Sequence, residues 1–281
     1  LKKKDYTTLK ALEVLSRHFR IPIQFIGYAG LKDKTAITTQ YLSFFRVRKE
    51  ILESFRHPDL DLYFVGYGKQ ALKTGDLLGN SFIITVREVE EKPLSISYLE
   101  NYFDEQRFST KNIILAKLLL QKKFKEICEL LELEGKDPVG LLQSKLSILK
   151  LCLHAYQSYL FNKVLATLLK PYQTGLVPYS LGNFIFVQEP PFSDPLALIN
   201  FDTILEGEIC ELYKTFLAED GITQEDFIFK QFPRLISETV YRDCFVPVKD
   251  FNYEFKDGTA VLKFSLPKGS YGSLVVKKLF C

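Results

Sequence analysis

The loop around Asp33 carries the residue types in this chain that are most suited to chemistry. Asp33 stands between Lys32 and Lys34, and Gly27 and Gly30 before it permit a tight loop. An aspartate flanked by two lysines favours its ionised form, which a nucleophile or general base needs, and the lysines could attract phosphate. A solvated turn of charged residues is the commoner explanation of these three residues when they are taken alone. Both interpretations stay open on these residues alone.

The elements before and after this loop must position it. Apolar residues spaced three and four apart predict a helix that is capped by Thr8 and ends before Pro22. Directly after the loop, β-branched and aromatic residues predict a strand at residues 36–45. Two more strands are predicted at residues 62–67 and 81–89, so the first segment alternates helix and strand.

From about residue 99 the hydrophobic period becomes that of helices. Helices are predicted at residues 113–133, 142–169, 202–218 and 224–229. Strand character returns at residues 241–248, 251–255 and 259–266, before a short helix capped by Ser270. A C-terminal block this short cannot bury a core alone, so we expect its strands to join the N-terminal sheet. The fold class is α/β (α+β): residues 1–98 and 246–281 form one domain, and residues 99–245 form a mostly helical insertion.

Charge is distributed unevenly along the chain. Residues 1–49 carry eleven Lys and Arg against three Asp and Glu, a net charge of +8, whereas the whole chain has +3. The segments 1–98, 99–245 and 246–281 have net charges of +5, −5 and +3. The two ends that we expect in one sheet are therefore both basic. This is consistent with a polyanionic partner, although a solvated basic face is the commoner explanation of charge alone.

Composition argues against several classes of protein. With 281 residues, 47% hydrophobic and 25% charged, the chain has the composition of a soluble globular protein, and no apolar run reaches the roughly 18 residues that span a bilayer. We see no export signal. The five cysteines and three histidines show no metal-ligand spacing, so we expect reduced thiols and no metal. The sequence contains no Met, from which we expect residues to be missing before Leu1.

Five ordered blocks resemble the TruD family of pseudouridine synthases. Residues 29–40 fill every position of the family's AGxKDxxAxTxQ signature, which carries its catalytic aspartate. Four further blocks are similar to family blocks in the same order: GNSFIITVR (79–87), NYFDEQRFS (101–109), AYQSYLFN (155–162) and LPKGSYGS (266–273). Asp104 and Gly272 depart from the family's usual glycine and alanine, and Asp104 implies a different turn there.

The resemblance implies an activity and a fold. It implies that Asp33 isomerises a uridine in tRNA, at position 13 in the D arm, by breaking the N-glycosidic bond and rejoining the ribose to C5 of the base. No redox change or hydrolysis occurs, so no cofactor and no metal are expected. The implied fold is a pseudouridine-synthase catalytic domain with a mixed, mainly antiparallel sheet and an inserted TRUD domain. We expect a monomeric cytoplasmic protein that binds tRNA and no membrane.

Three further residues map onto the family's uridine pocket. Strand alternation puts Asn80 and Phe82 on one face, where the amide of Asn80 could bind a uracil edge above Phe82. Asn80 could equally satisfy a turn after Gly79. Tyr271, at the start of the last helix, could stack on the base, although a packed core aromatic is the commoner case. The family's other base-contacting aromatic lies upstream of anything that resembles Leu1.

Basic residues of the same blocks could hold the RNA backbone. Lys32 and Lys34 would position phosphates next to the target uridine, and Arg107 would contact a phosphate or else pair with Asp104 and Glu105.

Two rival functions remain. One is a non-catalytic RNA-binding or RNA-folding protein that keeps the cleft, whose mark would be the loss of Asp33. The other is an acid-base enzyme such as a glycosidase, for which the blocks offer no second carboxylate.

Overall fold

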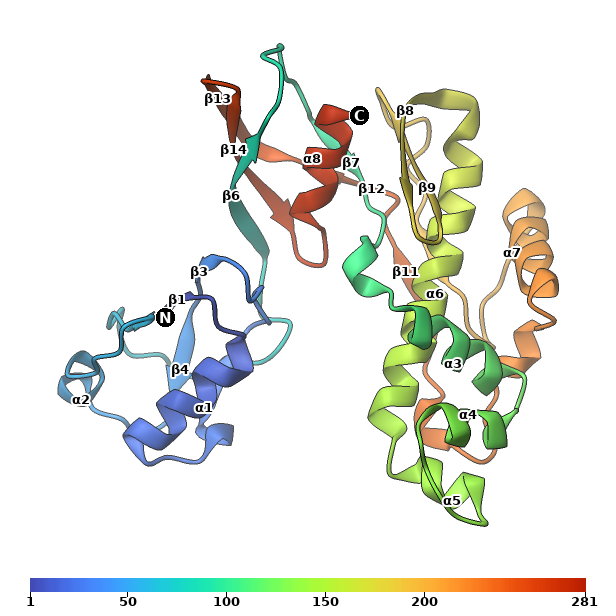
Figure 1. Ribbon diagram of the computed structural model, residues 1–281, viewed down its shortest axis with the longest axis horizontal. Helices are drawn as coiled ribbons and strands as arrows, with labels where there is room; N and C mark the ends of the chain where they lie inside the picture. Colours follow the sequence, from blue (N-terminus) through green and yellow to red (C-terminus); the bar gives the residue numbers. More distant parts are fainter. The chain divides into compact units, whose positions relative to one another are not determined.

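The chain folds into two compact units, residues 1–79 and 80–281. The computed structural model describes the backbone of residues 1–281 and every side chain except that of Thr110. Each unit has a hydrophobic core of its own, and both units mix helices with short antiparallel sheets (Figure 1). The predicted α/β class is therefore confirmed.

Unit 1 is built on a short sheet whose central strand is β1 (Lys2–Lys4). This strand pairs antiparallel with β3 (Ile37–Thr39) on one side and β5 (Leu60–Asp61) on the other. A second ladder joins β2 (Ile26–Tyr28) to β4 (Leu42–Phe44). The helical elements of unit 1 are α1 (Thr8–Phe19), η1 (Ile23–Phe25) and α2 (Lys49–Glu53). The buried face of α1 and strand residues form the core of unit 1.

Three details of unit 1 differ from the predictions. The cap of α1 is Thr7, whose hydroxyl accepts a hydrogen bond from the Lys10 amide, so the prediction of Thr8 as the cap was wrong. Gln40 and Tyr41 interrupt the strand predicted at 36–45 and split it between two sheets. The prediction of a strand at 62–67 was also wrong. The strand in this region is β5, which covers residues 60–61 and pairs with β1.

Unit 2 contains a three-stranded sheet in which β14 (Thr259–Pro267) lies between β13 (Lys249–Lys256) and β6 (Gly79–Arg87). Next to it, β7 (Tyr98–Glu100) pairs with β12 (Phe245–Pro247), and α8 (Gly272–Phe280) follows β14. The C-terminal strands β14 and β12 therefore pair with β6 and β7, which come earlier in the chain. We expected the C-terminal strands to join strands of the N-terminal part in this way. β1, β3 and β5, however, form the separate sheet of unit 1.

The helical part of unit 2 is arranged around the long helix α6 (Leu146–Leu169), with α3 (Thr110–Leu120) and α7 (Gly207–Glu219) beside it (Figure 1). The other elements are α4 (Phe124–Leu130), α5 (Pro138–Gln143), the strands β8 (Gln173–Tyr179), β9 (Gly182–Val187), β10 (Leu196–Leu198) and β11 (Val240–Arg242), and the 3-10 turns η2 (Glu105–Arg107), η3 (Lys170–Tyr172), η4 (Gln224–Phe227) and η5 (Pro233–Leu235). The helix predicted at 113–133 is two helices, because Lys122 adopts a left-handed conformation with φ of 60° between them.

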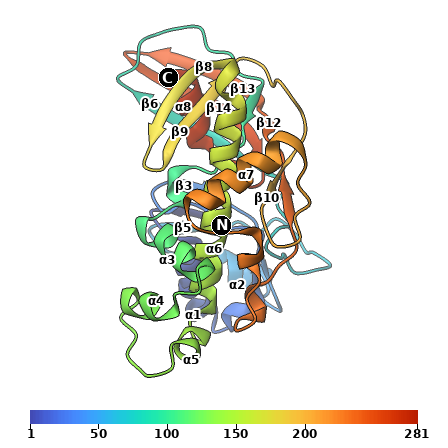
Figure 2. The ribbon, with the colours of Figure 1, turned by 90° about the vertical axis from the view of Figure 1, so that its right-hand side faces the viewer.

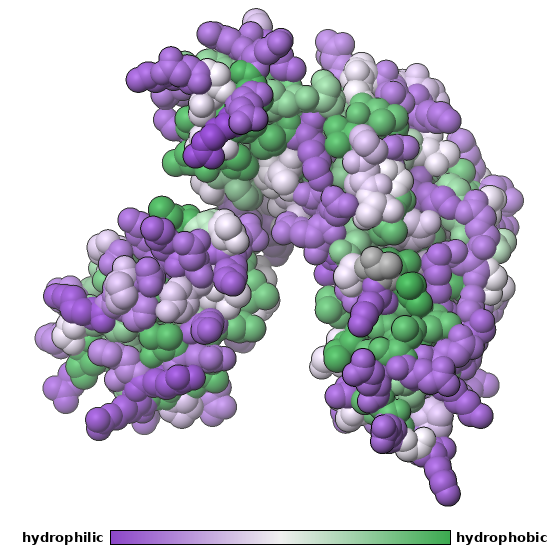
Figure 3. Space-filling model, viewed as in Figure 1, coloured by the Kyte–Doolittle hydropathy of each residue, from purple (hydrophilic) through white to green (hydrophobic). Residues whose placement is uncertain are grey.

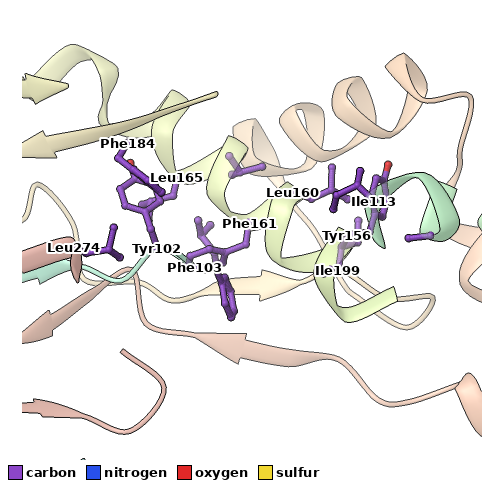
Figure 4. Close-up of a cluster of buried hydrophobic side chains, with 14 of the residues drawn as sticks. Tyr102, Phe103, Ile113, Tyr156, Leu160, Phe161, Leu165, Phe184, Ile199 and Leu274 are labelled. Carbon is purple, nitrogen blue, oxygen red and sulfur yellow. The ribbon is translucent and has the colours of Figure 1, made fainter. Parts of the chain in front are cut away.

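Aromatic rings fix the segment that follows β7. Figure 4 shows Tyr102 beside Phe184 of β9 and Phe103 beside Phe161 of α6, with ring centroids 5.3 and 5.6 Å apart. The β8–β9 hairpin also packs near α8, since the Lys277 ammonium lies 4.8 Å above the Phe184 ring (Figure 2). Residues 101–103 are thus held firmly where the chain enters η2.

The surface retains apolar side chains on both units. Figure 3 shows hydrophobic residues at the visible face of each, and unit 1 exposes Tyr41, Tyr63 and Tyr67. Among the described helices, none combines the length and the apolar character that crossing a membrane requires.

Candidate active site

Asp33 lies in an irregular loop between β2 and β3, and its side chain faces solvent. Residues 29–36 of this loop belong to neither a helix nor a strand. Lys34 is exposed like Asp33, whereas Lys32 is half-buried. Burial lowers the pKa of the Lys32 amino group, and the charge of Asp33 raises it in opposition. The loop therefore presents a carboxylate between two amines, as the sequence predicts.

Hydrogen bonds with Thr8 and Gln40 hold this loop. The Lys32 amide donates to the hydroxyl of Thr8 at 2.9 Å, and the Gln40 side chain donates to the Gly30 carbonyl at 3.4 Å. Thr8 also donates to the Gln40 side-chain oxygen at 3.1 Å. Thr8 is thus a loop anchor rather than a helix cap. Gln40, which ends the signature, therefore has a structural role, because its side chain closes the loop that carries Asp33.

Lys3 contacts Asp33 from inside the unit, and sequence reasoning missed it. The Lys3 side chain is fully buried, and its Nζ donates to the main-chain carbonyls of Tyr6 and Asp33, both at 2.6 Å. Burial lowers the pKa of its amino group, while the charge of Asp33 raises it and that of Lys32 lowers it. In the sequence Lys3 looks like part of a solvated run of three lysines. The available signal was strand alternation, which turns the middle lysine away from its neighbours.

In unit 2, β6 places Asn80 and Phe82 on the same half-buried face, as alternation predicts. The Phe82 ring stacks on Phe264 of β14, with centroids 5.3 Å apart and planes at 25°. Phe82 also lies against Gly272, because a Cβ added at Gly272 would stand 2.9 Å from its Cδ1 atom. The glycine at position 272 is therefore not a neutral replacement for alanine, since it makes room for Phe82.

Tyr271 occupies the cap position of α8 and is half-buried. Its ring meets that of Phe103 edge to face, with centroids 6.4 Å apart. Burial raises the pKa of the Tyr271 hydroxyl, and the nearby Arg107 and Arg242 charges lower it in opposition. The prediction that Ser270 caps this helix was wrong: its hydroxyl bonds Asn101 Oδ1 at 3.2 Å instead.

Arg242 fixes the turn before Tyr271, which sequence reasoning did not foresee. Its guanidinium donates to the carbonyls of Asn101 and Gly269, at 2.8 and 2.9 Å, and lies 4.1 Å above the Phe103 ring. Burial lowers the pKa of Arg242 to about 10. A single arginine in a strand gives no sequence signal for such a role, because its partners come from residues far away in the chain.

Arg107 lines a small pocket in the helical part of unit 2. The pocket has a volume of about 150 Å³. Its other lining residues include Phe103, His154, Ser158 and Glu238. The Arg107 Nε donates to the Ser158 hydroxyl at 3.4 Å. Burial lowers the pKa of His154, and the charges of Arg107 and Lys150 lower it further. The lowered pKa favours the neutral form of His154, so the guanidinium of Arg107 supplies the positive charge at this pocket.

The predicted pairing of Arg107 with its acidic neighbours does not occur among the described side chains. Asp104 instead accepts hydrogen bonds from the hydroxyl of Ser273 and, at 2.5 Å, from the Lys277 ammonium. The aspartate at this position therefore ties η2 to α8 next to Tyr271. It leaves the Arg107 guanidinium without a salt bridge within the part of the chain that the structure describes.

The predicted residues thus fall into two groups. Asp33, Lys32 and Lys34 share one loop of unit 1. Asn80, Phe82, Tyr271 and Arg107 belong to unit 2, where Gly272 and Phe103 connect their packing. Nowhere among the described side chains do three or more His, Cys, Asp or Glu residues gather as a metal ion would require.

Comparison with known proteins decides the family. The model of tRNA pseudouridine synthase D (TruD) matches residues 1–137 and 188–279. The chain belongs to the TruD family. The tRNA pseudouridine synthase D of Aquifex aeolicus is 29% identical over 100% of the chain and 90% of its own length. The "Probable tRNA pseudouridine synthase D 1" of Methanococcus maripaludis is 30% identical over 100% and 92%.

A solved structure supports the TruD fold independently. The crystal structure of the "Putative tRNA pseudouridine synthase D (TruD)" from Methanosarcina mazei matches 99% of this chain and 86% of its own, with a TM-score of 0.70 and 22% identity. The family resemblance derived from the five sequence blocks and the mixed α/β fold are both confirmed.

Proposed function

We propose that this chain is a tRNA pseudouridine synthase that converts a uridine, at position 13 in the D arm, to pseudouridine. The observation that carries the proposal is the exposed carboxylate of Asp33 on a loop anchored by Thr8, Lys3 and Gln40. An acid that must reach a substrate needs an exposed side chain on a fixed main chain. Membership in the TruD family supports the same activity.

The reaction exchanges one bond for another within a single nucleotide. The bond between N1 of uracil and C1′ of the ribose breaks, the base turns, and C5 forms a bond to C1′. The hydrogen on C5 leaves to solvent, and N1 gains a proton, so the atoms balance without an oxidant or a hydrolytic water. Asp33 would act as the nucleophile on the sugar or the base, or as the base at C2′ of the ribose.

The residues of unit 2 would hold the uridine outside the RNA stack, which an enzyme that acts on a base must do. Tyr271 would replace the lost stacking, Asn80 would bind the uracil edge, and Phe82 would support the base from below. The half-buried placement of these three side chains suits a surface that contacts a base. Their contact with substrate is part of the proposal.

Three basic residues would hold the RNA backbone. Lys32 and Lys34 flank Asp33 on its loop, where phosphates next to the target nucleotide would lie. Arg107 lies without a salt bridge among the described residues and lines a pocket with Ser158 and His154, so an RNA phosphate there would give the guanidinium an ionic partner. We further propose that the protein acts in the cytoplasm, as a monomer and without a cofactor, with residues 99–245 as an insertion in the catalytic domain.

Tritium release from C5-labelled uridine in unmodified tRNA tests the proposal directly. The wild-type protein should release tritium, and Asp33→Asn should release none while it binds tRNA as tightly as the wild type does. Asp5→Asn is a matched control, because Asp5 is an exposed aspartate of the same unit at a positive φ that asparagine tolerates. Binding without release by the wild type would instead identify a non-catalytic RNA-binding protein.

A further inference from the structure

A buried lysine supports the loop that carries Asp33. Lys3 is the middle residue of β1, with the exposed Lys2 and Lys4 on either side, and its side chain has no exposed surface. Its strand is hydrogen-bonded on both edges, so the side chain enters the unit from a rigid element. The sheet therefore fixes the main chain of Lys3, while burial and two hydrogen bonds hold its ammonium.

The Lys3 ammonium donates a hydrogen bond to the main chain of Asp33 itself. It donates to the carbonyl oxygen of Asp33 and to that of Tyr6, both at 2.6 Å, slightly shorter than the about 2.7–2.9 Å typical of charge-assisted N–H···O hydrogen bonds. Tyr6 precedes α1, so one side chain connects the sheet, the approach to the helix and the Asp33 loop. Thr8 bonds the loop one residue earlier, at the Lys32 amide. The peptide unit that follows the Asp33 Cα atom and the one that precedes the Lys32 Cα atom are thus anchored.

A lysine at this position is costly for the fold. Burying an ammonium loses its hydration, and within the described residues Lys3 forms no salt bridge that would compensate. The charged groups near it act in opposite directions, since Asp33 favours the ammonium and Lys32 disfavours it. An apolar residue would fill the space without this cost. What only the lysine supplies is a cationic donor at the Asp33 carbonyl.

We propose that Lys3 is a positioning residue of the reaction: it fixes the Asp33 main chain, and with it the direction of the exposed carboxylate, without contacting the uridine. This inference rests on the proposed function of Asp33. A positioning role differs from a purely structural one in its effect on a Lys3 variant. The variant should lose rate in the chemical step while it still folds and binds tRNA. Misplacing a reacting group by about 1 Å can cost about 100-fold in rate even when binding is intact.

The test compares Lys3→Met with Lys4→Met, which removes the exposed lysine next to it on the same strand. For each variant, the rate of tritium release under single turnover and the Kd for unmodified tRNA are measured separately. Lys3→Met should lose roughly 100-fold in rate with its Kd within about threefold of the wild-type value. Lys4→Met should keep the wild-type rate. Lys3→Arg, which keeps a cationic donor, should recover at least about tenfold over Lys3→Met.

A second measurement does not depend on activity. Amide hydrogen exchange across residues 30–36 should be faster in Lys3→Met than in Lys4→Met, because only the former frees the Asp33 carbonyl. If the wild type releases no tritium, the proposed function fails, while this exchange comparison still decides whether Lys3 holds the loop.

Three outcomes would overturn the proposal. They are a Lys3→Met rate within threefold of the wild type, unchanged exchange in the loop, and loss of tRNA binding together with the fold, which would make Lys3 a structural residue only.

Discussion

Gly272 leaves room for the ring of Phe82, whose Cδ1 atom lies 2.9 Å from the place where a Cβ at position 272 would stand. The ring is held on its other side by Phe264. Gly272→Ala should therefore destabilise unit 2, because overpacking costs about 1–3 kcal/mol and the better helix propensity of alanine offsets only up to about 1 kcal/mol. Urea unfolding measures the difference. The tRNA Kd should rise as well, since Phe82 must move.

A double-mutant cycle shows whether Phe82 is the cause. In a Phe82→Leu background, Gly272→Ala should cost less than it does in the wild type, because the smaller side chain can give way. Gly68→Ala is the matched control, since its added Cβ would meet only a carbonyl oxygen at 3.6 Å. An equal cost in both backgrounds would mean that the strain at Gly272 has another origin.

The strand that carries Asn80 and Phe82 was predictable because its pattern is long and local. Residues 80–87 of β6 alternate strictly, so the face that holds Asn80 and Phe82 follows from period two alone. The Asp33 loop was likewise predictable, since glycines, charges and the following strand lie within one short segment. By contrast, the choice between Thr7 and Thr8 as the α1 cap could not be made locally. Both are good caps, and the bonds of Thr8 to Lys32 and Gln40 decided it.

The residues that support the site were not predictable, because their partners are distant in the chain. Lys3 bonds a carbonyl 30 residues away, and Arg242 bonds one that is 141 residues away. Neither type of residue is expected inside a core, so burial itself gave no signal. The break between α3 and α4 was not predicted either. The hydrophobic pattern continues across it, and the single left-handed residue Lys122 divides the helix.

Replacing Tyr271 tests its stacking role. Tyr271→Phe keeps the ring and should retain a rate of tritium release within about threefold of the wild type. Tyr271→Leu should lose roughly 5- to 150-fold, the equivalent of about 1–3 kcal/mol for stacking on one base. Tyr241→Leu, at an exposed tyrosine of the same unit, should change neither rate nor Kd. A Leu variant as active as the Phe variant would remove Tyr271 from the base-contacting set.

Protonation of His154 should weaken the fold at acidic pH. Burial, Arg107 and Lys150 lower the pKa of His154 in the folded chain below its ordinary value of about 6.5. Between the two values the unfolded chain binds more protons, so stability is full above about pH 6.5 and falls as the pH drops through the folded pKa. Thermal unfolding from pH 8 to 5 should therefore decline less steeply for His154→Gln than for the wild type. His18→Gln, at an exposed helix position, is the control; equal slopes for all three proteins would contradict the assignment.

Arg107 should contribute one phosphate contact to tRNA binding. Each phosphate that a protein neutralises adds about 0.7–0.9 to the slope of log K against log salt. Arg107→Gln should therefore weaken binding at low salt and reduce this slope by roughly one, because the guanidinium has no salt bridge to lose among the described residues. Arg234→Gln, at an exposed arginine of the same unit, should change the slope less. Weaker binding with an unchanged slope would mean that Arg107 acts through its packing on Phe103 and Ser158 and not through phosphate.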